Sequence, residues 1–423
     1  MYEFFTLDNG LRVVVENIDY VSSISVGLWI ENGSRNENKY NNGISHFIEH
    51  MLFKGTTNRT AKKIAEEIED VGGQINAFTG KEATCYYIKV LNTHLELALD
   101  ILSDMLFNSK LAEEDIEKEK SVIYEEIDMN EDSPEDVLLD LHSKAIWGDD
   151  SISLPILGTK ETLKKLDRDL LKEYIYSYYI PENSVISICG NFDSNKIIRL
   201  VEKYFGNWNS KTKKITKYSK PSILENVFLK EKNIEQLHIN IGIPGIEIGN
   251  DDIYSLTLLC NILGGGASSI LFQKLREELG MCYSIYSYSS SLINTGIVSI
   301  YAALNIKYIR DALNIINDEL QKFTKGFITD EKLYKAKEQL KGSYILGLES
   351  TSSRMFKNGR SVLFLNKVNT PEHVLEKIDN IDINNINSVM DKTLRKGIKN
   401  IALVGNNYET VLKALGRDVI LYK

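Results

Sequence analysis

The sequence predicts an α+β protein made of two homologous domains, each a mostly antiparallel or mixed β-sheet covered by helices. Three observations support this prediction. Strand-like and amphipathic helical segments occur in mixed blocks, which is typical of helices packed on one face of a sheet. The segment ALDIL at 98–102 resembles ALNII at 312–316, and both lie in a helical pattern. A polar, basic stretch at 207–221 lies between the two copies.

The elements of the first half follow from the period of the apolar residues, which is two in a strand and 3.6 in a helix. Strands are predicted at 11–17, 22–30, 74–79 and 83–90, and the last two form a hairpin around Gly80 and Lys81. Helices are predicted at 43–54, 61–71, about 93–107 and 113–130. Gly55 ends the first of these helices.

The polar stretch sets the expected domain boundaries. Residues 211–221 are predicted to be a linker, because they are polar, basic and end in proline. An N-terminal domain would then cover 1–210, and a homologous C-terminal domain would cover 222–423. Each domain would be of ordinary size.

Composition places the chain among ordinary globular proteins. Of its 423 residues, 43% are hydrophobic and 26% are charged, which is unlike a disordered chain. Asp and Glu number 59 and Lys and Arg number 50, so the net charge is −9. Because nucleic-acid binding normally requires a basic surface, the charge balance gives no support to a nucleic-acid partner.

Cysteine usage and the N-terminal residues lead us to expect a cytoplasmic protein. No two cysteines form a CxxC pair, which favours reduced, buried thiols over disulfides; they are Cys85, Cys189, Cys260 and Cys282. Residues 1–16 contain no apolar segment of a signal peptide. The long uncharged stretches at 254–273 and 282–306 are interrupted by glycine, serine and tyrosine, so neither is expected to span a membrane.

The segment 46–50 reads HFIEH and carries the clearest chemistry. Positions four apart lie on one face of a helix, so His46 and His50 can bind one metal ion together. Glu49 lies on the same side and can act as a general base toward water activated by that metal. Catalytic zinc needs a third protein ligand and leaves a fourth position open.

The third ligand is expected on another helix. The predicted helix at 113–130 is acidic, and its Glu119 and Glu126 are separated by two helical turns, so they share a face. Most glutamates of such a helix are solvated. The pattern alone leaves four candidates open: Glu117, Glu119, Glu125 and Glu126.

The order HxxEH is the inverted zinc motif of the inverzincin metallopeptidases. The surrounding segment GISHFIEHMLFKGT resembles the active-site helix of the pitrilysin/insulinase family, and is most similar to mitochondrial processing peptidase and its bacterial relatives. The family's third zinc ligand lies about 76 residues beyond the second histidine, which implies Glu126 here. The resemblance therefore implies one Zn²⁺ per chain, bound by His46, His50 and Glu126. Glu119 is implied to support a ligand by a hydrogen bond without binding the metal itself.

A second implication of the resemblance concerns substrate binding. Asn76, Ala77, Phe78 and Thr79 resemble the family's edge strand, which pairs with the backbone of an extended peptide. Such pairing uses main-chain hydrogen bonds and depends little on the substrate's side chains.

The second half is implied to contribute a different part of the site. Arg276 and Tyr283 resemble the family's Arg/Tyr pair, which contacts the substrate or stabilises the developing tetrahedral intermediate. The internal repeat aligns the metal-binding positions of the first half with residues that cannot bind zinc in this way: Cys260, Gly264, Ala336 and Ser343. One active centre per chain is therefore expected.

Together these features predict a zinc-dependent endopeptidase that cleaves peptides or unfolded, presequence-like segments inside an enclosed chamber. Relatives build the chamber from four such domains, so the resemblance implies that this chain forms half of a clamshell. It further implies a homodimer in which Arg276 and Tyr283 act in trans. The alternative is a catalytically idle scaffold, or a peptide-binding subunit of a hetero-oligomeric processing peptidase. The presence of Glu49 beside both histidines favours the peptidase.

Overall fold

The computed structural model describes residues 2–209, 216–326, 328–415 and 419–422. Their contacts form two compact units, neither of which is one continuous stretch. The first unit comprises Met1–Ile127, Leu154–Lys217 and Ile345–Asn369, and the second comprises Asp128–Ser153, Tyr218–Tyr344 and Thr370–Lys423. Each unit thus includes a segment from the other half of the sequence. Residues 211–215 of the predicted linker lie outside the described residues.

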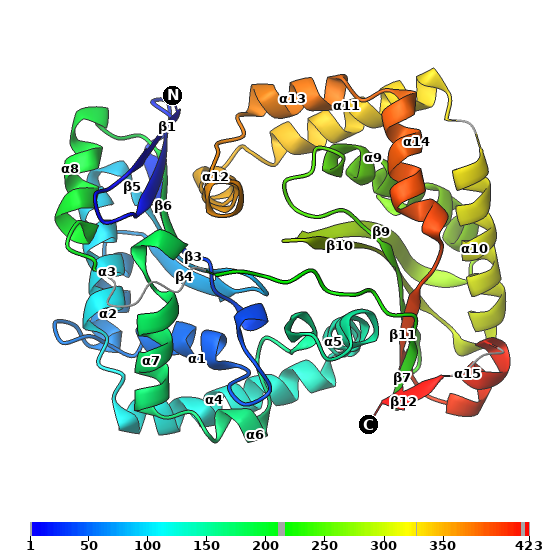
Figure 1. The fold of residues 1–423 in the computed structure, drawn as a ribbon, viewed down its shortest axis with the longest axis horizontal. Coiled ribbons are helices and arrows are strands. Elements are labelled where there is room, and N and C mark those ends of the chain that lie inside the picture. Colours follow the sequence, from blue (N-terminus) through cyan, green and yellow to red (C-terminus); the bar gives the residue numbers. More distant parts are fainter. Residues whose placement is uncertain (1, 210–215, 327, 416–418, 423) are drawn as a thin grey trace. The chain divides into compact units, whose positions relative to one another are not determined.

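The first unit is built on a six-stranded mixed sheet with the order β1-β2-β6-β3-β5-β4 (Figure 1). β2 and β6 run parallel, and the other neighbours are antiparallel. The strands are β1 (Tyr2–Thr6), β2 (Arg12–Asn17), β3 (Ser23–Ile30), β4 (Gln74–Thr79), β5 (Thr84–Leu91) and β6 (Ser184–Gly190). β4 is an edge strand of this sheet.

Helices cover both faces of the first sheet. Val13 and Val15 of β2 point to the main core, whereas Val14 belongs to a second cluster on the opposite face, because side chains alternate along a strand. The main core is closed by α1 (Ile44–Leu52), α2 (Ala61–Glu69), α3 (Leu95–Asn108), α4 (Glu113–Asp132), α7 (Arg168–Tyr178) and α8 (Ser194–Phe205). The opposite face is covered by α12 (Thr351–Leu365), which comes from the second half of the chain.

The second unit repeats this topology except at one edge, where β12 runs parallel to β7 although β1 is antiparallel to β2. Its sheet has the order β12-β7-β11-β8-β10-β9, with β7 parallel to β11 as β2 is to β6. The strands are β7 (Val227–Glu231), β8 (Leu237–Pro244), β9 (Cys282–Leu292), β10 (Thr295–Leu304), β11 (Asn400–Gly405) and β12 (Ile420–Tyr422). The predicted pair of homologous α+β domains with mixed sheets is therefore confirmed.

The helices of the second unit follow the same plan. The main core is closed by α9 (Ile253–Gly264), α10 (Ile309–Lys325), α11 (Asp330–Leu346), α13 (Pro371–Asp379), α14 (Ile383–Lys392) and α15 (Tyr408–Leu415). The opposite face packs against α5 (Pro134–Trp147), which comes from the first half of the chain. Each half of the sequence therefore supplies the covering helix of the other unit's sheet.

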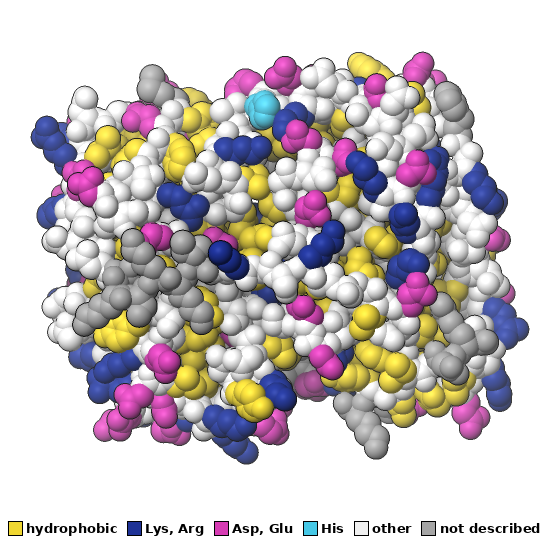
Figure 2. Space-filling model, in the orientation of Figure 1, with side chains coloured by type: hydrophobic (Ala, Val, Ile, Leu, Met, Phe, Trp, Pro, Cys, Tyr) yellow, Lys and Arg dark blue, Asp and Glu magenta, His cyan; other side chains and the backbone are white. Residues whose placement is uncertain are grey.

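The elements predicted for the first half all form, with ends displaced by a residue or two, as is usual for helix and strand boundaries. β1 was not predicted. Among the described helices, no segment combines the length and the apolar character needed to span a bilayer. On the face of the molecule drawn in Figure 2, acidic and basic side chains are interspersed.

Close packing fixes α12 on the first sheet. A Cβ atom added at Gly359 of α12 would lie 2.2 Å from Trp29 Nε1 on β3. Buried polar contacts add to this: Glu16 of β2 forms an ion pair with Arg354 and accepts a hydrogen bond from Asn358 at 2.7 Å. Because Glu16 is buried, this pairing compensates a charge that would otherwise be costly to bury.

The fit of α12 against Trp29 leads to a stability prediction. Gly359→Ala should lower the free energy of unfolding by about 1–3 kcal/mol, because the indole ring leaves no space for a methyl group. Gly342→Ala is the matched control: Gly342 lies in α11 with nothing within 4 Å of its added Cβ, so this change should stabilise the helix by about 0.5–1 kcal/mol. Thermal unfolding of both variants tests the prediction, and equal midpoints would contradict it.

Candidate metal centre

Helix α1 presents the HFIEH segment, and local sequence fixes where the helix begins. Gly43 precedes it with φ +93°, and a Cβ there would lie 2.7 Å from the backbone oxygen of Leu157, so glycine is required. The apolar side chains of Phe47, Ile48 and Met51 are fully buried in the main core. Burial of this face sets the rotation of the helix, so the remaining face carries the two histidines and Glu49.

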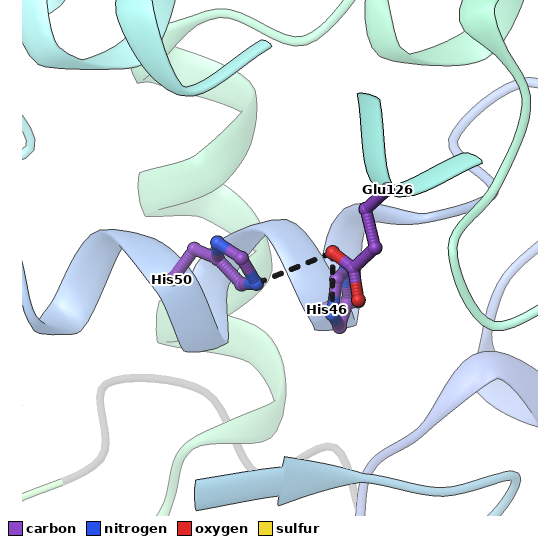
Figure 3. A group of neighbouring side chains, drawn as sticks. All are labelled: His46, His50 and Glu126. Atoms are coloured by element: carbon purple, nitrogen blue, oxygen red, sulfur yellow. Dashed lines mark ion pairs between the residues drawn. The ribbon is translucent and has the colours of Figure 1, made fainter. Parts of the chain in front are cut away.

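The structure brings His46, His50 and Glu126 together, as Figure 3 shows. Glu126 lies on α4, and its Oε2 atom is 3.7 Å from Nε2 of each histidine. One possible ligand atom from each residue lies within 4.8 Å of the others. Zinc bound tetrahedrally at about 2.0–2.1 Å separates its ligand atoms by about 3.3 Å, so this spacing suits a single ion.

The protonation state of His46 also suits a metal. Burial, and secondly the nearby His50, lower the pKa of His46 to about 3, so His46 is neutral at physiological pH. The neutral imidazole is the form that binds a metal. Two neutral imidazoles and one carboxylate form the donor set of many catalytic zinc sites, which leave a position open to water.

Glu119, on α4, contacts the side of the His50 ring that faces away from the metal centre. Its Oε1 atom accepts a hydrogen bond from His50 Nδ1 at 2.7 Å, and its Oε2 atom lies 2.5 Å from Lys54 Nζ. Burial raises the pKa of Glu119, but the hydrogen bonds from His50 and Lys54 outweigh it, and the net pKa is lowered. An ionised Glu119 can hold His50 in the tautomer that directs Nε2 toward the metal.

Glu49 lies beside the centre and is held by β4. Thr79 Oγ1 donates a hydrogen bond to Glu49 Oε2 at 2.5 Å. Burial raises the pKa of Glu49, although the bond from Thr79 and the charge of His50 oppose it, and the net pKa is raised. A carboxylate with a raised pKa is a stronger base than one in water, which suits a general base working near neutral pH.

The predicted substrate strand is β4, which pairs with β5 alone among the described strands. Asn76 and Phe78 are exposed, whereas Ala77 and Thr79 are half-buried, as expected for an edge strand with one face on the core. Asn76 Oδ1 accepts a hydrogen bond from the N–H of Ala77 at 2.8 Å. An extended peptide could pair with the open side of such a strand.

Arg276 and Tyr283 are brought together in the second unit. Arg276 lies in a π-helical segment, η5 (Phe272–Glu278), and its guanidinium carbon is 4.8 Å from the Phe272 ring centre and 5.2 Å from that of Tyr283. Tyr283 is the second residue of β9 and is 74% exposed. The pair and the histidines belong to different units, so a shared site stays a prediction.

The equivalent helices of the second unit lack the His-His-Glu donor set at the aligned positions. α9 contains Cys260 and Gly264, and α11 contains Ala336 and Ser343, at the positions aligned with the metal-binding residues. Within the described part of the chain, His46, His50 and Glu126 form the one group of three possible metal-binding side chains.

Sequence reasoning missed two contacts of the centre, those made by Lys54 and by the Thr79 hydroxyl. The contact of Lys54 could have been predicted from the sequence, because Lys54 lies four residues after His50, a spacing that places both residues on one side of a helix. No sequence pattern predicts the contact between Thr79 and Glu49, because it depends on how β4 packs against α1. The sequence placed Thr79 only in the predicted edge strand.

Sequence comparisons agree with this geometry. Residues 12–160 match the family described as insulinase, peptidase family M16, and residues 165–340 match the peptidase M16 inactive domain. The chain is 44% identical over 389 residues to the uncharacterized zinc protease YmxG of Bacillus subtilis, covering 92% of this chain and 95% of that protein. It is 38% identical over 395 residues to an uncharacterized zinc protease of Mycobacterium leprae, covering 92% of this chain and 89% of that one.

Solved structures share the fold. A protease from Helicobacter pylori superposes with a TM-score of 0.88 at 22% identity, covering 96% of this chain and 99% of that one. The peptidase M16 inactive domain from Pseudomonas fluorescens gives a TM-score of 0.89 at 17% identity, covering 96% of this chain and 98% of that one. At these identities the likeness concerns the fold alone.

The grouping of donors leads to a metal-binding prediction. The purified chain should bind one equivalent of zinc, and Glu126→Gln should abolish this stoichiometric binding, because the loss of one donor leaves only two. Glu125→Gln is the matched control, since the neighbouring carboxylate is exposed and outside the group. Metal content after dialysis measures both, and retention of zinc by Glu126→Gln would contradict the assignment.

Proposed function

Because the chain belongs to the insulinase family of peptidases, family M16, we propose that it is a zinc-dependent endopeptidase with its active centre on α1 and α4. The observation that carries the proposal is the convergence of His46, His50 and Glu126 beside Glu49. His46, His50 and Glu126 would bind the ion. When bound, zinc supplies a Lewis acid that activates water and polarises the scissile carbonyl.

Glu49 is the proposed general base. Its Oε2 atom is occupied by the hydroxyl of Thr79, so Oε1 is the oxygen left to accept the proton of the attacking water. Glu49 then returns that proton to the leaving amine, which completes peptide hydrolysis. The raised pKa of Glu49 supports both steps, because the group must gain and lose a proton near neutral pH.

The substrate is proposed to be an extended peptide or an unfolded segment. Asn76, Ala77, Phe78 and Thr79 would pair with its backbone along the open side of β4, and this pairing would place a peptide bond near Glu49. Main-chain pairing selects for extended conformation more than for sequence. A folded domain would have to unfold locally to be cleaved.

Arg276 and Tyr283 are proposed to stabilise the bound substrate or the developing oxyanion. The guanidinium lies over the rings of Phe272 and Tyr283, and the acidic side chain that forms an ion pair with it, Glu277, is 3.9 Å away. Such a group is preorganised to meet an anionic oxygen. We further propose a cytoplasmic homodimer that encloses the substrate, in which this pair serves the centre of the partner chain.

The first test replaces the base. Glu49→Gln should lower the rate of cleavage of a mixed peptide library by about 10²–10⁴-fold while zinc content is unchanged, because the amide cannot take the proton. Mass spectrometry reads the cleavage, and Glu125→Gln serves again as the control that removes a nearby charge. Full activity of Glu49→Gln would exclude the mechanism. No cleavage by zinc-loaded wild type would favour the idle scaffold or a missing partner subunit.

The second test concerns the homodimer. A Glu49→Gln chain mixed with a Tyr283→Phe chain should recover part of the wild-type activity, because one of the two centres then combines an intact base with an intact tyrosine. Each variant alone is the control. Absence of recovery in a mixed dimer confirmed by native mass spectrometry would show that Tyr283 does not act in trans.

A further inference from the structure

We propose that Lys54 is a positioning residue for the metal centre, and that it acts through Glu119 on the ligand His50. The inference rests on the proposed function insofar as it assumes that zinc binds His50. No part of the family resemblance assigned a role to Lys54.

A chain of three contacts runs from the ammonium group of Lys54 to the metal centre. Lys54 Nζ lies 2.5 Å from Glu119 Oε2, and Glu119 Oε1 lies 2.7 Å from His50 Nδ1. His50 Nε2, on the far side of the ring, lies 3.7 Å from Glu126 Oε2 at the centre. One oxygen of Glu119 therefore contacts Lys54, and the other contacts His50.

The position of Lys54 is fixed by the backbone that follows α1. Gly55 adopts φ +109°, which favours glycine, and its carbonyl accepts a hydrogen bond from the N–H of Lys110 at 3.1 Å. The N–H of Thr57 donates to the carbonyl of Asn108 at 2.9 Å. These bonds tie the loop after α1 to the connection between α3 and α4, so Lys54 is held against the helix that carries Glu119.

Side chains of the same loop strengthen this attachment. The buried Asp104 of α3 accepts hydrogen bonds from Thr56 at 2.7 Å, from Asn58 at 2.6 Å and from Arg59 at 3.0 Å. A loop with its polar groups satisfied in this way loses little freedom when Lys54 makes its contact. The ion pair is therefore preorganised, unlike a pair between two mobile surface side chains.

Charge explains why a lysine is needed. Glu119 is 3% exposed, and an ionised carboxylate at that depth is costly unless a cation compensates it. His50 contacts one oxygen of Glu119, and the ammonium group of Lys54 lies against the other oxygen, where it compensates the buried negative charge. With Glu119 held as an acceptor, His50 keeps its proton on Nδ1 and its lone pair on Nε2, the arrangement that binds metal.

The proposal predicts that removing Lys54 changes zinc affinity in the direction opposite to that expected from direct charge repulsion between Lys54 and the ion. Removing a cation near a Zn²⁺ ion would strengthen metal binding if Lys54 acted on the ion by repulsion alone. If Lys54 acts by fixing Glu119 and His50, its removal should weaken binding. The direction of the change therefore separates the two possibilities.

The experiment measures the zinc dissociation constant by competition with a chromophoric chelator, with the full chain. Lys54→Met should weaken binding by about tenfold, the scale of lost support for a metal ligand. Lys54→Arg, which restores a cation, should bind nearly as wild type. Lys62→Met is the matched control, because the exposed Lys62 side chain pairs with Glu66 within α2, at 3.1 Å.

A double-mutant cycle tests whether the effect passes through Glu119. Glu119→Gln alone should weaken zinc binding by about 10–100-fold, and adding Lys54→Met should cause no further loss. Thermal unfolding of the metal-free proteins shows whether each variant folds. If Lys54→Met does not fold, Lys54→Gln, which keeps the aliphatic stem and a polar end, replaces it.

The outcomes separate this inference from the proposed function. Wild type that binds no zinc would contradict the proposed function itself. Wild type that binds zinc with Lys54→Met equal to it or tighter would overturn only the role of Lys54. If Lys54→Met weakens zinc binding in the Glu119→Gln protein by the same factor as in wild type, Lys54 does not act through Glu119.

Discussion

The geometry of the centre depends on one buried carboxylate at the start of α1. Glu37 is 4% exposed and accepts hydrogen bonds from the N–H groups of Gly43 at 2.7 Å and Ser45 at 2.9 Å, and from the Asn42 amide at 2.8 Å. These N–H groups would otherwise be unsatisfied at a helix N-terminus. Burial raises the pKa of Glu37, although the hydrogen bonds from Gly43, Ser45 and Asn42 oppose that shift. Since His46 follows Ser45 directly, fixing the first turn fixes the first ligand.

The two units show that a shared topology does not require shared chemistry. β2 and β6 in the first sheet correspond to β7 and β11 in the second, and both sheets are covered by helices on both faces. The difference lies in a few positions on two equivalent helix pairs. The second copy fills these positions with small or neutral side chains, so its helices pack in the same way while offering no donor set for a cation.

Local sequence predicted the metal centre better than its surroundings. The spacing of His46 and His50 indicates a shared helical face without any knowledge of the fold. Glu126 could not be chosen from the acidic pattern of α4, because Glu117, Glu119 and Glu125 are equally polar, and only the family resemblance pointed to it. Contacts across elements, such as Thr79 with Glu49, depend on packing angles that no local pattern encodes.

The strands β2 to β5 and the helices α1 to α4 followed from apolar periodicity, but the exchange of α5 and α12 did not. An amphipathic pattern shows that a helix has a buried face, and it does not show which sheet will cover that face. The decisive features are tertiary. Gly359 permits the approach of Trp29, and Glu16 and Arg354 pair only after α12 has reached the first sheet.

This exchange has a consequence for synthesis on the ribosome. The last strand of the first sheet ends at Gly190, whereas α12 begins at Thr351. At 5–20 residues per second, the nascent chain waits roughly 8–30 s before that helix exists. During this interval the face around Val14, Trp29 and Val185 has no native cover. Nascent chains of this protein should therefore depend on chaperones that shield exposed apolar surface until the distal helix emerges.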